Sequence, residues 1–127
     1  MGAWGVGSFE NDGALDYLAS VEEVGASLIA GSLGQPFVEP DLEMDDAVEV
    51  LVAAEIVAAA ETGKLDRMPE GADAFLKSLG DLSGLKARAR AAVTIVRDGS
   101  ELSEVWAETD SHQQWLDDVN VLLSRIN

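Results

Sequence analysis

Residues 47–60 read AVEVLVAAEIVAAA and are apolar at every position except Glu49 and Glu55. The run is shorter than the roughly 20 residues that a bilayer-spanning helix needs, and two carboxylates interrupt it. A helix that is apolar on all sides must be surrounded by other elements in a water-soluble fold. The run therefore predicts a central buried helix, with other elements packed around it.

The flanking segments follow helical spacing and carry start and stop signals. Asn11 or Asp12 can cap a helix over residues 12–32, in which Gly25 lies on the apolar face and suggests that another backbone passes close by. Asp41 can cap the central helix, which ends at Gly63. Phe37 and Val38, between two prolines, are expected to fold back onto the core. Further helices are predicted over residues 70–79, over residues 83–99, from the cap Ser100, and from Ser111, with Gln114 completing a capping box.

Alternation with period two is not sustained anywhere, so strands have little support. The chain has 127 residues, 47% of them hydrophobic, which is enough for one core without disulfides or metal. We therefore predict an all-α, compact, single-domain bundle of five to six helices over residues 1–127, with the Gly/Trp-rich segment 1–11 packed on that core.

Charge is distributed unevenly along the chain, whose formal net charge is −16. Residues 1–63 carry 13 acidic side chains and no Lys or Arg, whereas residues 64–97 carry seven basic and four acidic ones. Two interpretations fit the basic segment: Lys86, Arg88, Arg90 and Arg97 neutralise the acidic helices of the same molecule, or they form a binding patch, and we favour the first. Nucleic acid is disfavoured as a partner, because most of this surface would repel phosphate. The absence of cysteine leaves the redox compartment unconstrained. With no secretory signal or membrane-spanning stretch, the expected location is the cytoplasm by default.

The opening stretch MGAWGVGSFEND invites comparison with phosphate-binding glycine loops. Its glycine spacing fits no dinucleotide fingerprint, no strand precedes it, and no Gly-Lys-Ser/Thr follows. We expect the glycines to let the chain bend, Trp4 and Phe9 to be buried anchors, and Asn11 and Asp12 to begin the first helix.

Glu55 is the most unusual residue, because it lies in the middle of the apolar run. A buried carboxylate needs a partner or a raised pKa. We expect Glu55 to be at least partly buried and hydrogen-bonded to the N-terminal segment or to an Arg of the helix over residues 83–99. The single histidine, the absence of a nucleophile elbow and the failure of residues 41–52 to match a calcium loop leave no predicted catalytic residue, cofactor or metal ligand.

Three stretches together resemble an uncharacterised bacterial family, the domain of unknown function numbered four-two-five-nine. The opening is similar to the family's Met-Gly-x-Trp-Gly-x-Gly-x-Phe-x-Asn-Asp signature, the middle stretch is AAEIVAAAETG, and the last is SELSEVWAE, where Val105 stands in place of an expected Leu. The resemblance implies a small standalone protein without assigned activity. It groups Trp4, Asn11, Asp12, Asp16 and Glu55 as a candidate polar cluster.

Two functions from different classes follow. The favoured one is an acidic module that binds a cationic protein, since complementary charge speeds such encounters. The alternative is a small-ligand protein or enzyme with a carboxylate site near the N-terminal turn and Glu55. A homo-oligomer is compatible with the sequence, because periodicity alone does not separate a dimer patch from the core.

Overall fold

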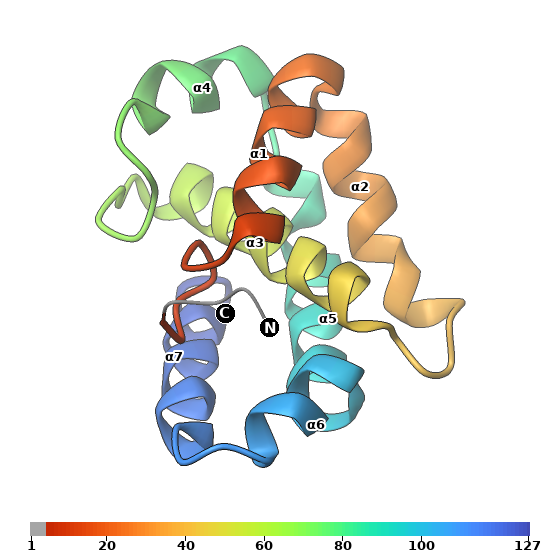
Figure 1. The fold of residues 1–127 in the computed structure, drawn as a ribbon. Coiled ribbons are helices and arrows are strands. Elements are labelled where there is room, and N and C mark those ends of the chain that lie inside the picture. Colours follow the sequence, from red (N-terminus) through yellow and green to blue (C-terminus); the bar gives the residue numbers. More distant parts are fainter. Residues whose placement is uncertain (1–4) are drawn as a thin grey trace.

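The computed structural model describes residues 5–127, and within them it contains α-helices and 3-10 turns but no strand (Figure 1). This confirms the all-α prediction, with seven α-helices in place of five to six. None of the helices in this part of the chain combines the length and apolarity that a membrane span requires. The elements are α1 (Asp12–Val24), α2 (Ala26–Gly34), η1 (Gln35–Phe37), α3 (Met44–Thr62), α4 (Ala72–Leu79), η2 (Ser83–Leu85), α5 (Lys86–Gly99), α6 (Glu101–Ala107) and α7 (His112–Arg125).

Helix α3 lies in the middle of the molecule, as its composition predicts. It contacts α1, α2, α5, α6 and α7, and in Figure 1 it crosses between α1 and α2 on one side and α6 and α7 on the other. All nine residues from 51 to 59 are buried. Several of them are alanines, whose small side chains let neighbouring helices approach closely. The hydrophobic core is therefore built around this one helix.

The single helix expected over residues 12–32 is wrong, because the chain breaks at Gly25. Gly25 has φ +98° and ψ −161°, a conformation open only to glycine. A Cβ placed there would meet nothing within 4 Å, so no other backbone passes close by as the sequence suggested. The glycine is instead required by the backbone angle that ends α1 and starts α2, and this break is one source of the additional helix.

The predicted N-cap residues differ in backbone conformation, and only the extended ones make a side-chain cap. Asn11 is extended, at φ −158° and ψ 158°, and its Oδ1 accepts the Ala14 N–H at 2.8 Å; Ser100 caps α6 in the same way. Ser111 occupies the N-cap position of α7 as predicted, but at φ −99° and ψ 11° its side chain makes no capping hydrogen bond, so the predicted capping box with Gln114 does not form. The cap predicted at Asp41 is wrong. Helix α3 begins at Met44, three residues after Asp41.

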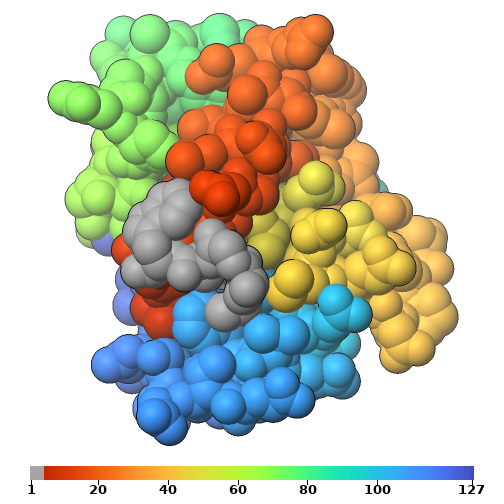
Figure 2. Space-filling view, in the orientation of Figure 1, coloured from red at the N-terminus to blue at the C-terminus, as the bar shows by residue number. Residues whose placement is uncertain are grey.

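The connector between α2 and α3 differs from expectation as well. Phe37 and Val38 are 53% and 76% exposed rather than folded onto the core, and this part of the chain stands out at the lower right of Figure 2. The reason is η1, in which Pro36 takes the buried position. A 3-10 turn has three residues per turn, so the residues that follow Pro36 point in other directions.

The described part of the N-terminal segment packs against the core through apolar side chains. Val6 and Phe9 are partly buried and contact the core cluster. Trp4, the other expected anchor, lies outside the described residues. Asn11 caps α1 as predicted, and Asp12 is its exposed first residue.

Candidate functional site

The buried carboxylate predicted at Glu55 is present, since this residue of α3 is only 3% exposed. Its partner is Arg67, from the connector between α3 and α4. Arg67 Nη2 donates to Glu55 Oε2 at 2.7 Å, and Nε donates to Oε1 at 3.1 Å. Two parallel hydrogen bonds of this kind make a charge-assisted, bidentate pair.

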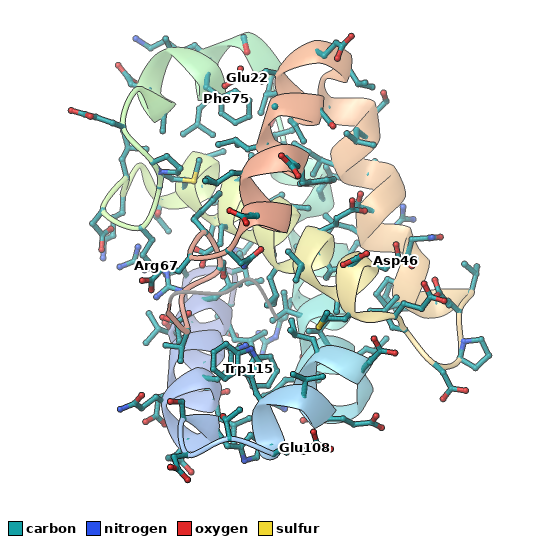
Figure 3. All side chains as sticks on the ribbon, viewed as in Figure 1. Glu22, Asp46, Arg67, Phe75, Glu108 and Trp115 are labelled. Atoms are coloured by element: carbon teal, nitrogen blue, oxygen red, sulfur yellow. The ribbon has the colours of Figure 1, made fainter. Side chains whose placement is uncertain are left out.

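The same guanidinium also holds Asp118 of α7. Arg67 Nη1 and Nη2 donate to the two Asp118 carboxylate oxygens, each at 2.9 Å. Burial alone would lower the pKa of Arg67, but its hydrogen bonds to Glu55 and Asp118 raise it above its ordinary value. Arg67 therefore stays charged and joins three elements at one point: α3, the connector between α3 and α4, and α7. Figure 3 shows Arg67 where this connector approaches α7.

The prediction of where the partner of Glu55 lies in the chain was thus wrong. We expected the N-terminal segment or an Arg of residues 83–99, whereas the cation comes from KLDRMPEG, a stretch without helical periodicity. The only available signal was the general need of a buried carboxylate for a cation. Asp118 carried no signal, because a carboxylate on an amphipathic helix ordinarily faces solvent.

An open recess lies above this cluster, with a volume of about 280 Å³. Its floor is Glu55, Arg67 and Asp118, its outer edge is Asp66, and its wall is the turn from Gly7 to Glu10. The Glu10 carboxylate closes that turn by accepting the Gly7 N–H at 3.0 Å. A Cβ on Gly7 would lie 2.6 Å from Glu10 Oε1, so a larger residue there would push the Glu10 carboxylate aside.

The remaining members of the predicted polar cluster lie elsewhere or outside the described residues. Asn11 lines a second cavity under the same turn, and Asp16 lines a shallow hollow of α1 and α3 beside Glu49. Asp12 is exposed. The structure thus places Glu55 beside the turn of residues 7–10, whereas Asn11 and Asp16 line other hollows; Trp4 is not among the described residues.

The second cavity lies between that turn, α3, α6 and α7. The aromatic side chains of Trp106 and Trp115 form one side of it, and Figure 3 shows Trp115 in the space between α7 and α6. Backbone from Gly5 to Ser8 forms another side.

Comparison with known families shows to which family the chain belongs. The model of the family described as Domain of unknown function (DUF4259) matches residues 2–118. The chain belongs to this family. No curated protein and no solved structure matches the sequence. The match confirms the resemblance, and its span includes Glu55, Arg67 and Asp118, the three residues of this charged cluster.

A different polar surface of the DUF4259 chain begins next to Val38, at Glu39. We call it the connector face: the exposed Phe37 and Val38 side chains together with Glu39, Glu43 and Asp46. Partial desolvation and the hydrogen-bonded Asp46 carboxyl raise the pKa of Glu39 above its ordinary value. The three acidic residues can bring one oxygen each within 4.8 Å of one another, the only such group of three in residues 5–127.

We expected Lys and Arg of residues 64–97 to neutralise the acidic half of the chain. Ion pairs in the described residues do not do so. Of the 13 acidic residues up to residue 63, only Glu55 forms a salt bridge to Lys or Arg in the part of the chain that the structure describes. On α5, Arg97 pairs with its neighbour Asp98, and Arg90 hydrogen-bonds Asn127. Direct contacts among residues 5–127 therefore give the intramolecular interpretation no support, and it stays a prediction; the carboxylates of the connector face have no Lys or Arg partner there.

Proposed function

We propose that this protein is an acidic binding module that recognises a cationic surface of another protein through its connector face. The observation that carries the proposal is an exposed aromatic and aliphatic pair beside carboxylates that no Lys or Arg of residues 5–127 pairs with. The cytoplasmic location expected from the sequence stays a prediction.

The two kinds of side chain have separate roles in this proposal. Burying a large apolar side chain at the centre of an interface supplies much of the binding energy, and Phe37 offers that anchor. Unpaired carboxylates speed the encounter and favour Lys and Arg on the partner. A second copy of this chain is a poor partner at this surface, because two-fold pairing through it would bring two negatively charged surfaces together.

The test begins with capture from a lysate of the source organism, by wild type and by two variants of the connector face. One variant is Phe37→Ser, and the other is Glu39→Gln/Glu43→Gln/Asp46→Asn. A basic protein should be retained by wild type at low salt and lost at high salt. With that protein purified, calorimetry should give a dissociation constant that rises roughly 30-fold for Phe37→Ser, as for a typical hot-spot residue.

Matched controls distinguish binding by this surface from a general effect of losing charge or an exposed apolar side chain. Val24→Ser removes another exposed apolar side chain, one that is 58% exposed at the end of α1. Asp16→Asn/Glu22→Gln/Glu23→Gln removes the same charge from α1. Both controls should bind nearly as wild type. Retention of the partner by Phe37→Ser, or equal loss in both charge triples, would contradict a specific connector face.

We also propose that the Gly/Trp-rich segment packs on the core along its length. Support comes from Val6 and Phe9 in its described part, which pack against the core cluster. Trp4→Gly should then lower the unfolding free energy by about 3–5 kcal/mol. A variant as stable as wild type would contradict the proposal.

A further inference from the structure

We propose that helix α4 is a hinged flap, which opens and closes over an apolar part of the core while the rest of the fold stays intact. The flap consists of residues 71–80, which are α4 itself (Ala72–Leu79) and the glycine at each of its ends. This proposal is independent of the connector face, which lies within residues 37–46.

Helix α4 differs from the other α-helices in how it is attached. Helices α1, α2, α5, α6 and α7 all pack on α3, whereas α4 packs extensively on no other element of residues 5–127 and lies at the upper left of Figure 1. Its apolar side chains Phe75, Leu76 and Leu79 are only partly buried against the core. A segment with few buried apolar contacts opens at a lower free energy than the whole protein.

Polar side chains do not hold α4 closed either. The side-chain interactions of residues 71–80 stay inside the segment: Lys77 pairs with Asp73, and the Ser78 hydroxyl donates to the Phe75 carbonyl at 2.6 Å. None of them reaches another part of the chain that the structure describes. Opening therefore breaks apolar contacts but no ion pair or side-chain hydrogen bond to the rest of the fold.

Glycines with positive φ lie at both ends of the flap. Gly71 has φ +82°, and Gly80 has φ +77° with ψ −154°, a region that is open almost exclusively to glycine. A hinge is a short stretch that absorbs a large change of backbone angles, and glycine has the widest range of such angles. The two glycines are therefore suited to act as the hinges.

The chain is held firmly just outside these glycines. Before the flap, Arg67 is held by the two carboxylates of its buried cluster, and Asp66 pairs with Arg125 of α7 at 2.8 Å. After the flap, Leu82 is 3% exposed, and the turn η2 that follows it contacts α3 and α5. Opening is therefore confined to the segment between these two fixed points.

Opening uncovers an apolar surface of α1 and of the connector between α3 and α4. Phe75 lies beside Glu22 of α1 in Figure 3, and both line a narrow hollow together with Leu18 and Met68. The hollow has a volume of only about 30 Å³, which is too small for an organic ligand. The closed flap thus hides Leu18 and Met68, and the open flap presents them to water.

Thiol labelling tests the flap, because the chain has no cysteine and one introduced thiol reports opening at its own position. Ala72→Cys places the thiol on the flap, where Ala72 is 7% exposed, and Ala59→Cys is the matched site on α3, where Ala59 is 4% exposed. Both are labelled with uncharged iodoacetamide at urea concentrations below the unfolding transition. Ala72→Cys should react at least about 100-fold faster than Ala59→Cys. Its rate should also depend less on urea, because opening exposes less surface than unfolding.

A hinge variant distinguishes opening from the small static exposure of residue 72. Alanine is strained at the backbone angles of Gly80, and opening releases that strain. Gly80→Ala should therefore raise the labelling rate of Ala72→Cys about tenfold. Gly84→Ala is the matched control and should leave the rate unchanged, since Gly84 has no positive φ and a Cβ there would meet nothing within 4 Å.

Hydrogen exchange of the unmodified protein gives a second measurement that needs no variant. The amides of residues 76–79 should exchange at least about 100-fold faster than those of residues 51–59, because a detached helix of this length does not persist in water. The proposal is overturned if α4 and α3 are equally protected, or if Gly80→Ala leaves the labelling rate unchanged. It is also overturned if these amides exchange fast while the thiol at position 72 stays as unreactive as that at position 59, which is the result expected of fraying at one helix end.

Discussion

Replacing Arg67 by Met should destabilise the protein far more than an ordinary loss of a salt bridge. The substitution keeps a long apolar side chain but removes the guanidinium from Glu55 and Asp118. Asp118 is 20% exposed and can take up water in its place, whereas Glu55 is 3% exposed and cannot. The cost is therefore set by one carboxylate left in the core without a counter-ion.

The magnitude follows from that difference in burial. Removing one partner of a buried ion pair costs about 3–5 kcal/mol, because the remaining charge is uncompensated. Arg125→Met is the matched control, since Arg125 pairs with Asp66, which is 62% exposed. An exposed pair of this kind contributes about 0–1 kcal/mol. We expect the two Arg→Met variants to differ by at least 2 kcal/mol on these figures.

Urea denaturation at pH 7, followed by far-ultraviolet circular dichroism, measures both free energies. The Glu55→Leu/Arg67→Met double variant should recover most of the loss, because two apolar side chains replace the pair. Equal losses in Arg67→Met and Arg125→Met, or a double variant as unstable as the single one, would refute this reasoning.

Three further predictions concern single side chains, each measured by the same denaturation. Gly25→Ala should cost about 1–3 kcal/mol because of its positive φ, whereas Gly31→Ala, inside α2 with open space around it, should stabilise by about 0.5–1 kcal/mol. Asn11→Ala should cost about 1 kcal/mol, and Ser111→Ala almost nothing, because only the first makes a cap. Burial raises the pKa of Tyr17 to about 12, so its stabilising contribution is complete below pH 10 and lost as the pH rises toward 12. Tyr17→Phe should flatten the stability curve in that range, and an unchanged slope would contradict the assignment.

The helical fold was largely predictable because its signals are local. An unbroken apolar run in α3 and the stripe on α7 through Trp115, Val119 and Leu122 each identify a buried surface from spacing alone. The break at Gly25 was not predictable, because glycine within a helical pattern is equally compatible with a continuous helix, a kink or a close contact. The exposure of Phe37 depends on which residue of a short turn faces inward. Composition does not reveal that residue.

The candidate site was predictable only in part. Glu55 stood out because a charge in an apolar run is rare and needs compensation. Its partner is 12 residues away in an irregular connector, and Asp118 is a further 51 residues along the chain. That meeting depends on how the connector and α7 lie against α3, and no spacing rule in one sequence encodes it.

Glu55 has one more consequence, for the rotational setting of α3. Nine consecutive buried residues give the middle of this helix no polar side other than Glu55 to turn toward water. A rotation of about 100°, which is one residue, would exchange one apolar contact for another in that stretch. The same rotation would carry Glu55 away from Arg67 and leave a charge unpaired in the core. One ion pair thereby adds to side-chain packing in fixing the orientation of the middle of α3.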